Sequence, residues 1–203
     1  QATASVTPNA ARARSMAHNM DIPGWKDNIL FTPGPLTTSR TVKQAMLRDL
    51  GSRDFAFIST VKDIRARLAA MTGASRDFEA VPMQGSGTYS VEAVLSSCVA
   101  PDGKVLAIVN GAYGKRIVQM LRVLKIDHTI IESAEDQYPD LATIEHALAH
   151  DKRINFVAVV HCETTTGIIN PIDKIGALAK AAGAYYFVYA MSSFGAVPVA
   201  FNA

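Results

Sequence analysis

Short apolar runs alternate with amphipathic segments from about residue 80 onward, and this alternation constrains the fold more than any other feature. The runs are rich in β-branched or aromatic residues and are bounded by Gly, Asp, Asn or Lys, as is typical of buried strands. They are "KVLAIVN" (104–110), "DHTIIE" (127–132), "INFVAVVH" (154–161) and "YYFVYA" (185–190). Between them, residues 88–99, 113–125, 141–151 and 172–183 repeat apolar residues at i, i+3 and i+4, which indicates helices. We therefore predict an α/β fold: a mostly parallel, doubly wound sheet with helices on both faces.

The chain divides into an extension and one domain. Residues 1–27 show no helical apolar period, so we expect a poorly ordered N-terminal extension, although its acid-poor, Arg-containing start also resembles a transit segment. Residues 28–203 form the predicted domain, with a helical lead-in over 41–74 that breaks at "GSRD". Gly183 is expected to end the last helix.

Composition excludes several classes of partner. The net charge is +2 and the basic residues are dispersed, so we predict no nucleic-acid binding. No apolar stretch approaches the ~18 residues that a membrane span needs, so no membrane contact is expected. Cys98 and Cys162 lie far apart, which predicts no disulfide framework, two small buried side chains, and a reducing, cytoplasmic location.

In a sheet of this kind the ligand binds at the carboxyl ends of the strands, so the loops that follow the strands are the candidate site. These loops contain Gly, Ser, Thr and one aromatic residue, without His, Asp or Glu at metal-ligand spacing. We therefore predict a planar, anionic ligand and no metal. The loops are "QGSGT" (84–88), "NGAYGKR" (110–116), "HCETTTG" (161–167) and "YAMSSFG" (189–195).

The first of these loops has the residue types of a phosphate site. Gly87 allows close approach of the backbone, and the hydroxyls of Ser86 and Thr88 stand beside the free N–H groups of a helix start. The alternative is a Gly-rich turn in which a hydroxyl only caps the helix.

The other loops contain single residues whose roles stay open on sequence alone. Tyr113 could stack on a flat ligand ring or be an exposed loop aromatic. The threonines from Thr164 onward could contact a ligand or bond their own turn, and His161 is expected to be a buried, hydrogen-bonded core residue. Asp54 and Glu163 show no identifiable partner, and Lys115 with Arg116 looks like a solvated helix face.

Five segments together resemble a known family. They are "LFTPGPLTT" (30–38), "MQGSGTYSVEAV" (83–94), "NGAYGKRIVQM" (110–120), "VVHCETTTGIINPI" (159–172) and "AMSSFG" (190–195). In this order and spacing they resemble the 2-aminoethylphosphonate–pyruvate transaminases, class V aminotransferases of fold type I that depend on pyridoxal 5′-phosphate (PLP). The resemblance implies a homodimer that moves the amino group of 2-aminoethylphosphonate to pyruvate, giving phosphonoacetaldehyde and alanine. Residues 28–203 would then be the N-terminal portion of the PLP-binding large domain, and a sister alanine– or serine–glyoxylate transaminase is the alternative within class V.

The resemblance implies roles for particular positions. Cofactor-binding roles fall on Ser86, Gly87, Thr88, Tyr113, Thr164 and Tyr189. The first three would hold the phosphate, Tyr113 would stack on the pyridine ring, and Thr164 would contact the region of the ring hydroxyl. Thr32 and Gly34, in "TPGP", would line the substrate site.

Two departures from the family pattern bear on activity. The family's Schiff-base lysine lies beyond the "DAMSSFG" stretch, whereas the last lysine here is Lys180, so the resemblance assigns no catalytic residue to this apparently truncated chain. The aspartate that pairs with the pyridinium nitrogen is replaced by Tyr189, and a neutral phenol does not replace an anionic carboxylate. We therefore expect this chain alone not to transaminate. The alternatives are a non-catalytic binding or interaction module, or a Tyr189 that points into the core while a neighbour takes its role.

Overall fold

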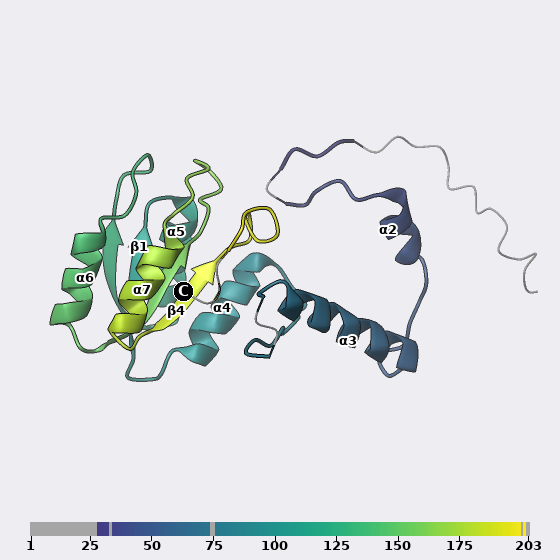
Figure 1. The fold of residues 1–203 in the computed structure, drawn as a ribbon, viewed down its shortest axis with the longest axis horizontal. Coiled ribbons are helices and arrows are strands. Elements are labelled where there is room, and N and C mark those ends of the chain that lie inside the picture. Colours follow the sequence, from purple (N-terminus) through teal and green to yellow (C-terminus); the bar gives the residue numbers. More distant parts are fainter. Residues whose placement is uncertain (1–27, 33, 74–75, 200, 202–203) are drawn as a thin grey trace, which may run out of the picture.

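Four strands form one parallel sheet in the computed structural model, which describes residues 28–32, 34–73, 76–199 and 201. The strand order is β2-β1-β3-β4 (Figure 1). The strands are β1 Lys104–Val109, β2 Asp127–Glu132, β3 Ile154–Val160 and β4 Tyr185–Tyr189. Every predicted strand is confirmed, with its end at most one residue from the expected position. The prediction for residues 1–27 lies outside the described residues.

The two central strands, β1 and β3, are buried on both faces, which explains their unbroken apolar sequences. Because successive side chains of a strand point to opposite faces, β1 contributes to two separate cores. Val105, Ala107 and Val109 pack in one core, and Leu106 and Ile108 pack in the other.

Helices cover both faces of the sheet, as predicted. Helices α4 (Gly87–Cys98) and α5 (Ala112–Val123) supply Leu95 and Leu121 to one core. Helices α6 (Leu141–His150) and α7 (Ile172–Ala181) supply Ile144 and Ile175 to the other. Burying one such side chain contributes ~1.5–3 kcal/mol, so these two layers make the doubly wound arrangement stable.

The chain order creates a switch point between the two central strands. From β1 the chain passes through α5 to β2 at the edge, then returns through α6 to β3 on the other side of β1. The loops after β1 and β3 therefore lie side by side at the carboxyl edge, where doubly wound sheets bind ligands.

Helix α7 ends as the sequence predicts. Gly183 has φ 71° and its N–H donates to the Lys180 carbonyl at 3.0 Å, while the Ala184 N–H donates to the Ala179 carbonyl at 2.9 Å. This pair of bonds is the Schellman motif, which requires a left-handed residue and so favours glycine at that position.

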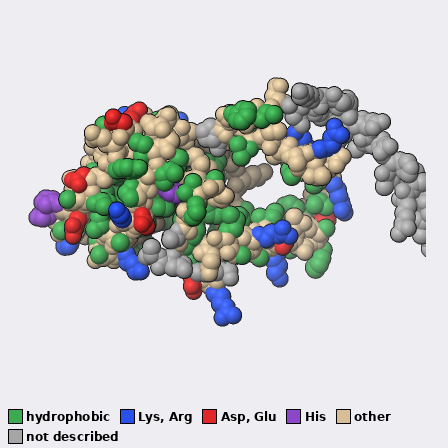
Figure 2. Space-filling view, turned by 45° about the horizontal axis from the view of Figure 1, so that its top comes forward, with side chains coloured by type: hydrophobic (Ala, Val, Ile, Leu, Met, Phe, Trp, Pro, Cys, Tyr) green, Lys and Arg blue, Asp and Glu red, His purple; other side chains and the backbone are tan. Residues whose placement is uncertain are grey.

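The helical lead-in forms an arm beside the sheet. It consists of α2 (Arg40–Ala45), α3 (Phe55–Ala70) and the connection between them, where the predicted break at "GSRD" is confirmed. Asp54, for which the sequence showed no identifiable partner, accepts a hydrogen bond from the Gly51 N–H at 2.7 Å. Neither helix has a buried residue, and the arm extends away from the sheet (Figure 1) with hydrophobic side chains on its surface (Figure 2).

The two cysteines are both free, as expected, but their burial differs from the prediction. Cys98 is exposed, because Val99 takes the core-facing position at the end of α4, and Cys162 is half-buried. Within the described part of the chain, none of the helices is long and apolar enough to cross a membrane.

Candidate functional site

Residues 86–88, the predicted phosphate site, lie at the start of α4 and are called the cradle below. Ser86 is the N-cap, and its Oγ accepts a hydrogen bond from the Tyr89 N–H at 3.2 Å. The N–H groups of Gly87 and Thr88 are in the first helical turn, where no carbonyl of the same helix can accept from them. The capping turn and the anion cradle are therefore compatible, because the cap leaves N–H groups at the positive end of the helix.

Glu163 orients the start of α5, where Tyr113 lies. Its carboxylate is fully buried and accepts from the Tyr113 N–H at 3.1 Å and the Gly114 N–H at 2.8 Å. A Cβ on Gly111 would lie 2.5 Å from the Glu163 Cδ, so only glycine allows this close approach. The sequence showed no identifiable partner for Glu163, because its partners are backbone groups distant in sequence.

Tyr189 stacks on Tyr113. The ring centroids are 5.9 Å apart and the ring planes differ by 20°. The Tyr189 hydroxyl oxygen lies 2.8 Å from where a Cβ on Gly87 would stand, so the side chain reaches the cradle. Burial raises the pKa of the Tyr189 phenol, Tyr113 raises it further, and Arg116 opposes both. Tyr189 is therefore part of the site as a neutral phenol at neutral pH.

Arg116 belongs to the site, although the sequence suggested a solvated helix face. Its Nη1 donates to the Thr88 Oγ1 at 3.4 Å, and its guanidinium carbon lies 5.1 Å from the centre of the Tyr113 ring. Lys115, in contrast, turns outward to Glu132 and Glu135, as predicted. Tyr113 and Arg116 are three residues apart on a helix, so their side chains are neighbours on one face. This spacing could have indicated from the sequence that Arg116 lies at the site.

His161 and Ser193 join the loops after β3 and β4. The His161 ring Nδ1 lies 2.8 Å from the Ser193 Oγ, and the His161 backbone N–H donates to the Tyr189 carbonyl at 2.9 Å. Burial lowers the pKa of His161, which is a hydrogen-bonded core residue as predicted. The Ser192 Oγ adds a bond to the Cys162 carbonyl at 2.8 Å.

Two buried asparagines join β1 to the segment after β3. Asn110 and Asn170 exchange side-chain amide bonds of 2.8 and 2.9 Å. Asn170 also donates to the Val160 carbonyl at 2.9 Å, and Asn110 donates to the Gln137 carbonyl at 3.0 Å. These bonds satisfy both amides and hold the switch point together.

Comparison with known proteins identifies the family. The model of the family "Aminotransferase class-V" matches residues 37–203. The chain belongs to the class V aminotransferases.

The similarity to curated relatives is strong but covers only part of them. The chain is 49% identical over 175 residues to proteins of Salmonella typhimurium and Burkholderia thailandensis, each named 2-aminoethylphosphonate–pyruvate transaminase. The match covers 86% of this chain, and 48% and 47% of those relatives. The chain therefore spans about half the length of the curated relatives it matches.

Solved structures agree on the fold. Pyridoxamine–pyruvate aminotransferase from Mesorhizobium loti superposes with a TM-score of 0.76 at 30% identity, covering 83% of this chain and 43% of that one. Alanine–glyoxylate aminotransferase from Nostoc sp. gives a TM-score of 0.75 at 26% identity, covering 97% and 50%. Both neighbours are aminotransferases, which confirms the predicted fold class.

Thr164, Thr32 and Gly34 are the remaining positions to which the family resemblance assigns a role. Thr164 is half-buried in a turn closed by the Gly167 N–H, which donates to the Glu163 carbonyl at 2.7 Å. Thr32 and Gly34 are exposed near the arm, where the Thr32 hydroxyl bonds the Pro35 carbonyl. The substrate role of Thr32 and Gly34 stays a prediction, as does the cofactor role of Thr164.

The family implies PLP as the cofactor, and the described side chains fit its phosphate but not its ring. Its phosphate matches the cradle and Arg116, because both offer donors and positive charge. Its ring does not fit: the cavity bordered by Thr88, Tyr113, Arg116 and Tyr189 is about 10 Å³. That volume holds ~1 water molecule. As the side chains stand, Tyr189 fills the space beside the Tyr113 ring and next to Gly87.

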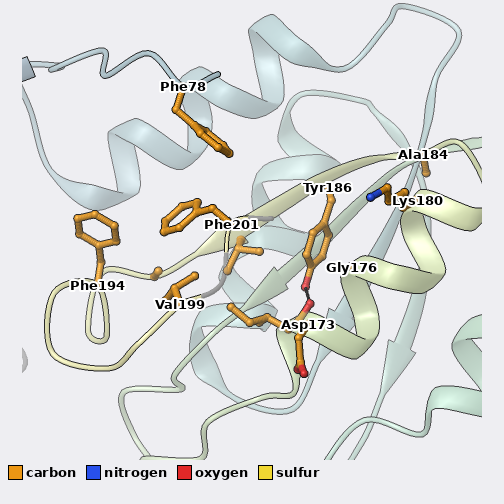
Figure 3. A pocket seen from close by; sticks show the side chains of 12 residues that line it. Phe78, Asp173, Gly176, Lys180, Ala184, Tyr186, Phe194, Val199 and Phe201 are labelled. Atoms are coloured by element: carbon orange, nitrogen blue, oxygen red, sulfur yellow. Dashed lines mark hydrogen bonds between the residues drawn. The ribbon is translucent and has the colours of Figure 1, made fainter. Parts of the chain in front are cut away.

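A larger groove lies elsewhere, on the α7 side of β4. It is a groove of about 590 Å³ in which Phe78, Phe194 and Phe201 point toward one another (Figure 3). Tyr186 lines it from β4, with its hydroxyl donating to the Ile172 carbonyl at 2.8 Å. Its lining is mainly apolar and aromatic, with Asp173 and Lys180 as the charged residues.

No group of three or more His, Cys, Asp or Glu residues is placed to hold a metal ion in the part of the chain that the structure describes.

Proposed function

We propose that this chain is the cofactor-binding portion of a transaminase that moves the amino group of 2-aminoethylphosphonate to pyruvate, giving phosphonoacetaldehyde and alanine. The observation that carries the proposal is the 49% identity, over 175 residues, to relatives of that name. The cradle at the switch point supports it, because a phosphorylated planar cofactor needs donors at the carboxyl edge of the sheet.

Within that protein, the described residues have distinct proposed tasks. The N–H groups at Gly87 and Thr88, the Ser86 hydroxyl and the Arg116 guanidinium would bind the phosphate. Glu163 would keep the start of α5, and with it Tyr113, in place through its two backbone bonds.

We further propose that the 203-residue polypeptide on its own does not transaminate. The family's lysine follows the stretch after β4, and the last lysine of this chain, Lys180, lies on α7 before β4. Lys180 is near the amino end of β4, whereas the cradle is at the carboxyl edge of the sheet. Tyr189 adds a second obstacle, because a neutral phenol cannot pair with a cationic ring nitrogen as a carboxylate does.

A second candidate function is a non-catalytic binding or interaction module. The stacking of Tyr189 on Tyr113 favours it, because the chain fills its own ring position. A sister alanine–glyoxylate activity has weaker support, since the Nostoc sp. enzyme of that name shares 26% identity with this chain.

A second copy of the chain is the proposed partner, and the arm is the surface that supports a homodimer. Its apolar side chains are exposed along both helices, which is unusual for a surface that stays in water. They include Val42, Met46, Leu47, Phe55, Phe57, Ile58, Ile64 and Leu68. A cytoplasmic location also stays a proposal, which rests on the two unpaired cysteines.

A chimera tests the proposed function. Residues 1–203 are joined to the remaining C-terminal part of the Salmonella typhimurium relative, with Tyr189 retained or changed by Tyr189→Asp. We expect the Tyr189→Asp chimera to form alanine from pyruvate when 2-aminoethylphosphonate is the donor, and the Tyr189 chimera to form at least ~100-fold less. A folded Tyr189→Asp chimera that prefers glyoxylate, or uses neither acceptor, would contradict the proposal.

A further inference from the structure

We propose that Tyr189 keeps the ring position of this site closed, where the ring position is the space beside the Tyr113 ring and against the start of α4. The inference rests on the proposed function only in naming PLP as the ligand. It concerns binding, and it needs neither a lysine nor a substrate.

The spacing of the two rings excludes a third ring between them. Non-bonded carbon atoms approach to ~3.5 Å, so a ring inserted between two parallel aromatic faces needs them ~7 Å apart. The centroids of Tyr113 and Tyr189 are only 5.9 Å apart. The Tyr189 hydroxyl also borders Gly87, so the same side chain fills the space between Tyr113 and the cradle.

The backbone around Tyr189 is held in place, so opening requires its side chain alone to rotate. Tyr189 is the last paired residue of β4, opposite Val160 of β3. Its carbonyl accepts a hydrogen bond from the backbone N–H of His161. The loop after β4 is held by side-chain hydrogen bonds of Ser192 and Ser193. Met191 also borders this space, because its Cε lies 3.1 Å from the Cβ position on Gly87.

Removal of the phenol ring, rather than of its hydroxyl, is what should open the site. Tyr189→Ala deletes the ring, whereas Tyr189→Phe keeps it and serves as the matched control. Tyr185→Ala is a second control, because it removes an exposed tyrosine from the same strand. Thermal unfolding of each variant shows that it is folded before binding is measured.

The probe is pyridoxamine 5′-phosphate, which has no aldehyde and so cannot react with surface lysines. Its affinity is measured by isothermal titration and compared with that of inorganic phosphate, which needs only the cradle. For the unmodified chain, Tyr189→Phe and Tyr185→Ala, we expect the two ligands to bind within about threefold of each other. For Tyr189→Ala, we expect pyridoxamine 5′-phosphate to bind at least ~10-fold more tightly than to the unmodified chain.

Two results would overturn the inference. One is an unmodified chain that binds pyridoxamine 5′-phosphate at least ~10-fold more tightly than phosphate. The other is a folded Tyr189→Ala chain without any gain in affinity. If Tyr189→Ala does not fold, the binding experiment is done with Tyr189→Asp instead. The comparison of pyridoxamine 5′-phosphate with phosphate on the unmodified chain tests the inference without any variant. If the Tyr189→Asp chimera does not use 2-aminoethylphosphonate but the Tyr189→Ala chain gains affinity, the proposed function is contradicted and the inference about Tyr189 is not.

Discussion

The rings of Tyr113 and Tyr189 lie 5.9 Å apart and nearly parallel, so the aromatic residue that the family resemblance assigns to the cofactor ring is paired within the chain itself. Tyr113 comes from the start of α5 and Tyr189 from the end of β4. The chain thus combines the fold of a class V aminotransferase with a Tyr189 side chain that fills the space between Tyr113 and the start of α4.

Arg116 should strengthen phosphate binding once the ring position is open. In the Tyr189→Ala background, we expect Arg116→Ala to weaken pyridoxamine 5′-phosphate binding ~10-fold, because a charge-assisted hydrogen bond to phosphate is lost. Isothermal titration measures the change. Arg122→Ala, on the last turn of the same helix, is the control and should leave the affinity unchanged. Equal losses in the two variants would mean that Arg116 acts only through net charge.

Glu163 should be a stabilising residue of the switch point. Glu163→Ala removes the acceptor of the buried Gly114 N–H and the half-buried Tyr113 N–H, so we expect the free energy of unfolding to fall by ~1–3 kcal/mol. Urea denaturation measures it. Glu135→Ala removes an exposed carboxylate that pairs with Lys115 and should change the stability by less than ~0.5 kcal/mol. A Glu163→Ala chain as stable as the control would show that water replaces the lost carboxylate.

Asp151 should make stability sensitive to strong acid. Its pKa is lowered from an ordinary 3.8 to about 2, chiefly by the hydrogen bond from Lys104 and then by the Arg153 backbone N–H. Because the folded-state pKa is the lower one, this contribution is fully present above pH 3.8 and is lost as the pH falls toward 2. The unfolding temperature of the unmodified chain should exceed that of Asp151→Asn by a constant amount above pH 4 and converge with it near pH 2. A difference that persists at the acid end would contradict this assignment.

The arm should make the chain self-associate. Phe55 is 86% exposed on α3, and we expect its contact with a second copy to contribute to a dimer. Phe55→Asp should raise the dissociation constant at least ~10-fold in light scattering, whereas Thr60→Asp, a polar position on the same helix, serves as the control. A monomer peak for the unmodified chain at high concentration would exclude the arm as a dimer surface.

The regular elements were predictable because their signals are local. The apolar runs of β1 and β3 reflect burial on both faces, and Gly183 marks the left-handed end of α7. The start of α4 could likewise be located from a glycine and two hydroxyls, whereas phosphate binding there stays a prediction. Each of these inferences needed only a few neighbouring residues.

The contacts that decide the site were not predictable, because they join distant residues. Tyr189 meets Tyr113, Glu163 caps the start of α5, and Arg116 reaches Thr88, each across two separate elements. The sequence showed that Tyr189 replaces an aspartate of the family, but not which way its ring points. Whether the arm packs on the sheet was also undetermined, since an apolar helix face does not specify its partner.

The most direct test of the account is a PLP titration of the 203-residue chain followed by borohydride reduction and intact-mass measurement. The account predicts no stoichiometric adduct at any one lysine, because the ring position is filled and the last lysine, Lys180, precedes β4. A reduced adduct on one particular lysine, formed at stoichiometric PLP, would show that this lysine meets the cofactor in a formed site. That result would contradict both the closed ring position and the proposed inactivity of the chain.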